Sequence, residues 1–151
     1  MGEKKSGFFY TPLTKKALKI CFEAHKDQKD KSGLPYVFHP FHLAEQMETE
    51  EEICTALLHD VLEDSSVTLE DLRKAGMPET VLEALQLLTH DDAVPYMTYV
   101  ENLKAHPIAR KVKLADLSHN SDGARLDVIT EKDRKRMEKY KKARKVLEEM
   151  P

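Results

Sequence analysis

The 151-residue chain has no tryptophan, two cysteines and only five glycines. Cys21 and Cys54 lie in apolar helical patterns without CxxC spacing, so we expect two buried free thiols and no disulfide. No stretch approaches the ~20 consecutive apolar residues of a membrane span, and the N-terminal residues lack the apolar core of a signal peptide. We therefore expect a cytoplasmic protein with no membrane partner.

The chain also lacks a large excess of charge of either sign. Its formal net charge is −3, so it has no overall positive potential for binding a nucleic acid polymer. Charged residues still make up 34% of the chain, more than the ~25% of an average domain, and residues 132–145 are strongly basic. We interpret this basic run as the solvated face of a C-terminal helix; a surface for an acidic partner is the alternative.

Apolar residues recur with helical spacing along the chain, and no segment shows the period-two alternation of a β-strand. Several prolines stand where they would open helices, and Thr68 is a suitable N-cap. The length fits a single domain over residues 1–151, so we predict an all-α bundle of about eight helices. The expected helices cover about 12–28, 40–48, 50–63, 68–76, 78–88 and 95–105, a segment that begins at Pro107, and 130–149.

One expected core helix ends in an unusual cluster of ionisable residues. The segment 50–63 is apolar on almost every side, which is typical of a helix at the centre of a core. Ionisable groups in such surroundings are costly to desolvate, and a bound divalent cation is the usual compensation for clustered carboxylates and imidazole. The residues concerned are His59, Asp60, Glu63 and Asp64.

A second apolar helix contains the same anomaly. Asp116 lies between apolar neighbours in the segment that Pro107 opens, and His39 stands directly before the helix that Pro40 is expected to open. Histidine nitrogens together with carboxylate oxygens form a donor set that suits manganese, iron or zinc. The sequence therefore indicates a metal site built from distant segments.

Three stretches, in this order, resemble the HD-domain metal-dependent phosphohydrolases, whose signature is H…HD…D on helices. They are most similar to the RelA/SpoT-type hydrolases of guanosine tetra- and pentaphosphate, (p)ppGpp, among them the small alarmone hydrolases. The resemblance covers about residues 14–125. The stretches are residues 28–40, with Gln28, Ser32, Gly33, Pro35, Tyr36, His39 and Pro40 in place, Leu57–Asp64 complete, and Lys113–Asn120 complete.

The resemblance implies a role for each matching residue. Glu63 and Asp64 match the pair of the branch that removes pyrophosphate with manganese, and we expect both to be catalytic. Glu63 stands four residues beyond His59, on the same helix face, where a carboxylate can orient or deprotonate a water whose pKa the metal lowers. The implied metal ligands are His39, His59, Asp60 and Asp116.

Substrate contacts are expected from Lys31, Ser32 and Asn120, of which Asn120 resembles the residue that contacts the nucleotide sugar. Two departures fall on the substrate side. Asp30 stands where the family usually has an arginine that packs against guanine, and residues 121–123 read Ser-Asp-Gly in place of Met-Arg-Thr. A carboxylate cannot stack or donate as a guanidinium does.

The remaining histidines are expected to be mainly structural. We interpret His25, His90 and His106 as packing residues, whereas His42 could also touch substrate or metal. For His119 a role in orienting Asp116 and a role in packing are both open.

We therefore expect an enzyme that removes pyrophosphate from the 3′ position of guanosine tetra- or pentaphosphate, with Mn²⁺ as cofactor and a role in the stringent response. One alternative is an HD phosphohydrolase that acts on another nucleotide. The other is a regulatory module that binds a nucleotide without hydrolysing it. The expected partner is the nucleotide substrate, and the oligomeric state stays open, with a homo-oligomer among the options.

Overall fold

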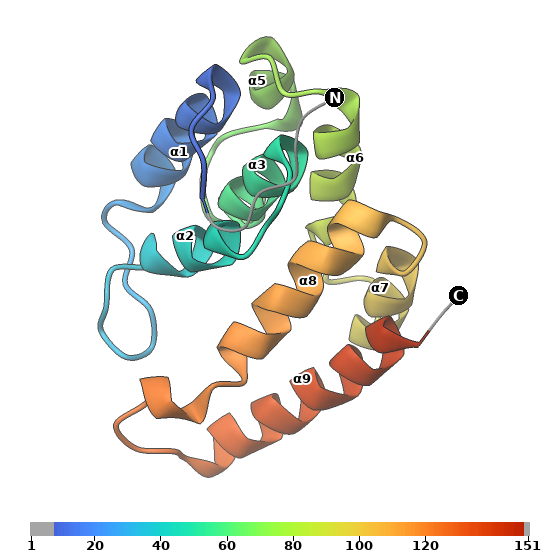
Figure 1. The fold of residues 1–151 in the computed structure, drawn as a ribbon. Coiled ribbons are helices and arrows are strands. Elements are labelled where there is room, and N and C mark those ends of the chain that lie inside the picture. Colours follow the sequence, from blue (N-terminus) through green and yellow to red (C-terminus); the bar gives the residue numbers. More distant parts are fainter. Residues whose placement is uncertain (1–7, 150–151) are drawn as a thin grey trace.

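A computed structural model describes residues 8–149 of the chain. These residues form helices packed around one core, without a named strand among them (Figure 1). No helix in this part of the chain is long and apolar enough to cross a membrane. The elements are α1 (Pro12–His25), α2 (Phe38–Glu45), α3 (Glu50–Leu58), α4 (Val61–Asp64), α5 (Leu69–Lys74), α6 (Glu79–Leu88), α7 (Tyr96–Leu103), α8 (Pro107–Asn120), the 3-10 turn η1 (Gly123–Arg125) and α9 (Glu131–Glu148).

Threonine side chains fix the starts of four helices. Thr11, Thr49, Thr68 and Thr130 each accept a hydrogen bond from the backbone N–H three residues later, and the residue at that position returns a side-chain bond. Each such capping box satisfies backbone donors that a helix start leaves unpaired. The N-cap predicted at Thr68 is confirmed.

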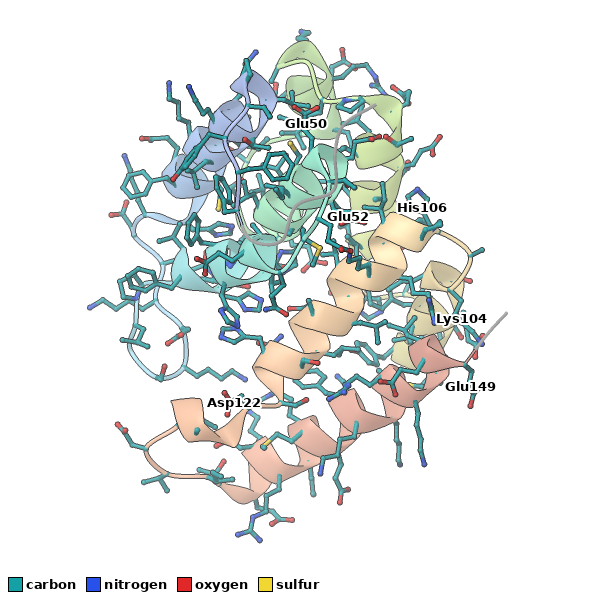
Figure 2. The ribbon with its side chains drawn as sticks, in the orientation of Figure 1. Glu50, Glu52, Lys104, His106, Asp122 and Glu149 are labelled. Atoms are coloured by element: carbon teal, nitrogen blue, oxygen red, sulfur yellow. The ribbon has the colours of Figure 1, made fainter. Side chains whose placement is uncertain are left out.

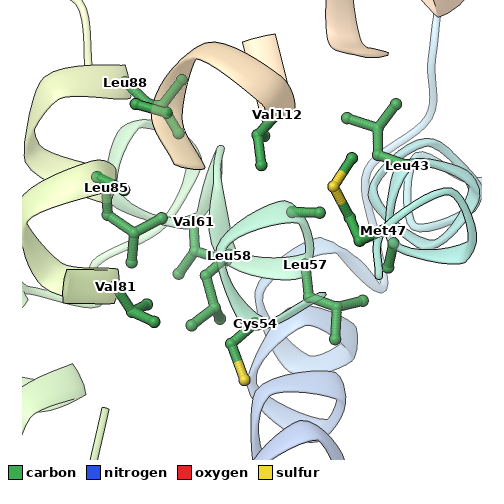
Figure 3. Close-up of a cluster of buried hydrophobic side chains, with 14 of the residues drawn as sticks. Leu43, Met47, Cys54, Leu57, Leu58, Val61, Val81, Leu85, Leu88 and Val112 are labelled. Carbon is green, nitrogen blue, oxygen red and sulfur yellow. The ribbon is translucent and has the colours of Figure 1, made fainter. Parts of the chain in front are cut away.

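Helix α3 lies at the centre of the core, as its apolar composition predicts. Its residues from Ile53 to Leu58 are buried, and it packs against α1, α2, α6 and α8. Figure 3 shows Cys54, Leu57 and Leu58 of α3 between side chains of α2, α6 and α8. Cys21 and Cys54 are both buried and free, so that prediction is confirmed.

Two predicted helix boundaries are wrong. The helix expected over 50–63 is not continuous, because the chain leaves α-helical geometry at Asp60 (φ −108°, ψ 1°) and resumes as α4. The helix expected from Pro40 already begins at Phe38, so His39 lies inside its first turn. Proline is tolerated there because the N–H groups of a first turn have no helical partner.

Helix α9 folds back along α8 after η1, and the two are in contact (Figure 1). It is anchored by the buried side chains of Ala143 and Leu147, while most cations of its basic run are exposed, as a solvated face requires. Asp122, labelled in Figure 2, lies at the turn between α8 and α9, near the loop that joins α1 to α2. This end of the molecule contains the candidate site.

Candidate metal and active site

The break after α3 brings His59 and Asp60 to one point. Adjacent residues of a regular α-helix point about 100° apart, because a helix has 3.6 residues per turn. The non-helical backbone at Asp60 changes that direction, and His59 Nε2 lies 3.1 Å from Asp60 Oδ2. The ring of His59 is nearly fully buried. The helix break thus allows neighbouring residues to act on one ligand.

His39 and Asp116 reach the same point from α2 and α8. His39 Nε2 lies 2.9 Å from Asp116 Oδ1, and the same oxygen lies 3.5 Å from His59 Nε2. One donor atom each from His39, His59 and Asp60 falls within a span of 4.8 Å. The structure therefore brings all four residues predicted as metal ligands together.

The surroundings of the two ring nitrogens of His59 test whether this cluster fits a cation. Its Nδ1 lies 2.7 Å from the Ala56 carbonyl, so Nδ1 carries the proton and donates it. Its Nε2 faces the two carboxylates but has no hydrogen-bond partner. An imidazole held by its other nitrogen, with Nε2 directed at carboxylate oxygens, is the usual arrangement of a metal ligand. The residues fit a divalent cation.

The charges around the cluster lead to the same conclusion. Although burial favours neutral imidazole, the carboxylates of Asp60 and Asp116 raise the pKa of His59 well above its ordinary value. The site therefore attracts positive charge, which a proton or a metal ion can supply. A divalent cation neutralises several carboxylate oxygens at once.

Two neighbours on α8 hold Asp116 in place. Lys113 Nζ lies 3.0 Å from Asp116 Oδ2, and Asn120 Nδ2 donates to Oδ1 at 3.0 Å. Although burial opposes ionisation, Lys113, with help from His39 and His59, keeps the pKa of Asp116 well below its ordinary value. Asp116 is therefore a carboxylate with a fixed orientation.

A cavity of about 320 Å³ adjoins the cluster through His39 and Tyr36. It contains the three residues predicted to touch substrate, since Lys31, Ser32 and Asn120 all line it. Its size falls within the range of small-molecule sites. The structure thus places a cavity of small-molecule size beside the metal-ligand cluster.

Glu63 and Asp64 lie on α4, just beyond the cluster. Glu63 accepts a hydrogen bond from the backbone N–H of His90 at 2.7 Å, and Asp64 accepts one from the Gln28 amide at 3.2 Å. Burial raises the pKa of the Glu63 carboxyl above its ordinary value, although the His90 bond opposes this. A raised pKa makes a carboxylate a stronger base, which suits a group that accepts a proton.

Asp30 has a structural role that its sequence position did not reveal. Its Oδ1 accepts bonds from the Ser32 N–H at 2.9 Å, the Ser32 hydroxyl at 2.7 Å and the Leu34 N–H at 3.0 Å. Aspartate often closes a turn in this way. The carboxylate therefore fixes the turn that carries Lys31 and Ser32.

Sequence reasoning missed three residues of the site. The motif match assigns no role to Tyr36, but its hydroxyl donates to Asp60 Oδ2. Arg136 and Tyr140 of α9 line the cavity, although the basic run that contains them predicts a solvated helix face. Their spacing of four residues places them on one helix face, but only the fold reveals that this face meets the cavity.

His119 packs against His39. Its ring is stacked on the His39 ring, with centroids 4.9 Å apart, and the two Nδ1 atoms lie 2.6 Å apart. A hydrogen bond between these nitrogens leaves His39 Nε2 directed at Asp116. His119 thus orients a predicted metal ligand.

Comparison with known proteins identifies relatives of the chain. No family model matches the chain. Guanosine-3′,5′-bis(diphosphate) 3′-pyrophosphohydrolase MESH1 of Danio rerio is 32% identical over 123 residues, which cover 73% of this chain and 68% of that protein. The guanosine-3′,5′-bis(diphosphate) 3′-pyrophosphohydrolase of Aquifex aeolicus is 34% identical over 134 residues, which cover 82% of this chain but 19% of that protein.

Structural comparison gives the same fold. A solved structure described as a metazoan ortholog of SpoT that hydrolyzes ppGpp superposes with a TM-score of 0.77, covering 93% of this chain and 88% of that one at 23% identity. The helical fold and the H…HD…D arrangement define an HD-type hydrolase. Given its similarity to MESH1, the chain belongs to the family of guanosine-3′,5′-bis(diphosphate) 3′-pyrophosphohydrolases.

Proposed function

We propose that this protein hydrolyses guanosine tetra- or pentaphosphate at the 3′ position and releases pyrophosphate, with Mn²⁺ held by His39, His59, Asp60 and Asp116. The observation that carries the proposal is the position of His59 Nε2 between two carboxylates, beside a cavity lined by Lys31, Asn120 and Arg136. The names of the family members supply the reaction. A cytoplasmic location belongs to the same proposal.

A divalent cation in such a site supplies Lewis acidity, which lowers the pKa of water and offsets charge on a phosphoryl group. The chain's own residues would do the rest. Glu63, with its raised pKa, would accept the proton of the attacking water, and Asp64 would help to orient that water. Both carboxylates are fixed by hydrogen bonds from outside α4.

The cavity wall would bind the nucleotide. Lys31 on the α1–α2 loop and Arg136 on α9 face a common space. Burial lowers the pKa of Lys31, and the positive charge of Arg136 lowers it further. Such repulsion between cations is relieved when an anion binds between them, as a phosphate group would. Ser32 and Asn120 would contribute hydrogen bonds to the same ligand.

The test is incubation of the purified protein with Mn²⁺ and guanosine tetraphosphate, with the products separated by ion-exchange chromatography. We expect guanosine diphosphate and pyrophosphate in equal amounts. Absence of pyrophosphate, together with turnover of another nucleotide, would contradict the proposed substrate.

A second candidate is hydrolysis of a different nucleotide by the same site. Asp30 favours it, because its carboxylate closes the turn and cannot stack on guanine. On a nucleotide panel, the Asp30→Arg variant should gain preference for guanine nucleotides if this position controls base recognition. An unchanged preference would exclude Asp30 as the determinant. Asp30→Ala is the matched control, since it also breaks the turn bonds but adds no guanidinium.

A further inference from the structure

His25 is a buried histidine that the proposed chemistry does not use. It is the last residue of α1 and is fully buried. Its Nδ1 lies 2.8 Å from Gln28 Oε1, and Gln28 Nε2 donates to Asp64 Oδ2 at 3.2 Å. A continuous hydrogen-bonded chain therefore joins a core residue to a candidate catalytic carboxylate.

The directions of these hydrogen bonds are fixed from the carboxylate end. An ionised Asp64 can only accept, so the NH₂ group of Gln28 must face it. The amide oxygen of Gln28 then faces His25, and Nδ1 of His25 must carry the proton that it donates. The chain has one consistent polarity, from His25 through Gln28 to Asp64.

Other contacts of His25 are unlike those of a simple packing residue. Its Nε2 is buried and has no hydrogen-bond partner, and an unsatisfied buried polar atom is destabilising. An apolar side chain would fill the same space without that cost. The ring also packs edge-on against Tyr36, with centroids 4.9 Å apart, and Tyr36 donates to Asp60.

Asp64 needs such support because it is exposed. An exposed carboxylate samples several rotamers in water, and each productive orientation must be selected at an entropic cost. The Gln28 amide, itself fixed by His25, selects one orientation beforehand. Groups held in this way reach the reacting geometry more often.

We propose that His25 is a positioning residue that, through Gln28, holds Asp64 in the orientation needed for hydrolysis. The inference rests on the proposed function, since it assigns His25 to the same reaction. It differs from the structural role that the sequence suggested for this histidine.

The first test needs no substrate. Long-range ¹H–¹⁵N NMR spectra of the wild-type protein should show His25 with the proton on Nδ1, and Gln28→Leu should weaken that preference. Gln86→Leu, on the exposed face of α6, is the matched control and should leave it unchanged. A wild-type His25 ring with its proton on Nε2 in place of Nδ1 would overturn the inference.

The second test is kinetic. His25→Phe should lower kcat about tenfold, the lower end of the range for supporting residues, with little change in KM. His25→Asn, whose amide can donate from nearly the same place, should restore most of the rate. Leu72→Ala, which truncates the buried side chain of α5, controls for lost stability and should keep the wild-type kcat at temperatures below its own melting temperature.

A double-mutant cycle separates positioning from general disturbance. In an Asp64→Asn background, His25→Phe should cost almost nothing more, because the group it positions has already been altered. An equal loss of rate in both backgrounds would overturn the inference. Where His25→Phe does not fold, Gln28→Leu takes its place in the cycle. The wild-type rate alone decides the proposed function, so the two failures are distinguishable.

Discussion

The ring of His59 shows how a single residue can define the candidate metal site. Its Nδ1 is committed to the Ala56 carbonyl, which leaves Nε2 for the cation. Asparagine at this position can retain the first bond but cannot supply the second nitrogen. His59→Asn should therefore fold yet lose more than about tenfold in Mn²⁺ affinity, as measured by isothermal titration calorimetry.

The control for this variant is His106→Asn. His106 caps α8 through its Nδ1, and asparagine is also a good N-cap, so stability and Mn²⁺ affinity should both be retained. Equal affinities of His59→Asn and the wild-type protein would mean that His59 is not a ligand.

The pKa of Glu63 should determine how the rate of hydrolysis depends on pH. A base must be deprotonated to act, and burial raises the pKa of this carboxyl. The rate should therefore fall, as the pH is lowered, at a higher pH than the ~4.3 of an ordinary glutamate would give. Glu63→Gln should lose about 100-fold or more in kcat and also lose this acidic limb, in a pH profile of kcat under saturating Mn²⁺.

Retained Mn²⁺ binding is the control for Glu63→Gln, because Glu63 is not among the proposed ligands. The same assays, run on the wild-type protein, distinguish an enzyme from a module that only binds a nucleotide. Wild-type protein that binds the nucleotide and does not turn it over would support the module, and an undiminished rate of Glu63→Gln would exclude Glu63 as the base.

At the scale of elements, hydrophobic periodicity predicted most helices but not the break between α3 and α4. The apolar pattern continues through Val61, so nothing local distinguishes a bent helix from a straight one. The bend becomes visible in the backbone of Asp60, where His59 and Asp60 meet residues of α2 and α8. The four ligand positions could be proposed from motifs, whereas their convergence required the fold.

Helix α9 supplies a further prediction. Its sequence reads as a solvated basic helix, yet Arg136 lines the cavity while it pairs with Asp133 at 2.9 Å. Arg136→Gln should lower kcat/KM through a higher KM and leave Mn²⁺ affinity unchanged, because it removes a cation from the nucleotide side alone. Lys142→Gln, exposed on the same helix, should behave like the wild-type protein in the same steady-state assay.

A raised KM in both variants would attribute the effect to the overall charge of α9. An unchanged KM in Arg136→Gln would show that the cavity wall on α9 does not contact the nucleotide.

At the scale of the whole molecule, the site is assembled from segments far apart in the chain. The α1–α2 loop, α2, the α3–α4 break, α8 and α9 all contribute residues to one end of the bundle (Figure 1). The core around α3 fixes the relative positions of these segments (Figure 3). The metal-ligand cluster and the cavity therefore form only in the folded chain, and the central claim is that they act together.

The most direct test of that claim is a titration of metal-stripped protein with Mn²⁺ in the presence of guanosine tetraphosphate. Pyrophosphate release should be absent without metal and should rise with Mn²⁺ occupancy to a plateau at one ion per chain. Release that is independent of added metal, or full occupancy without any release from this substrate, would contradict the account.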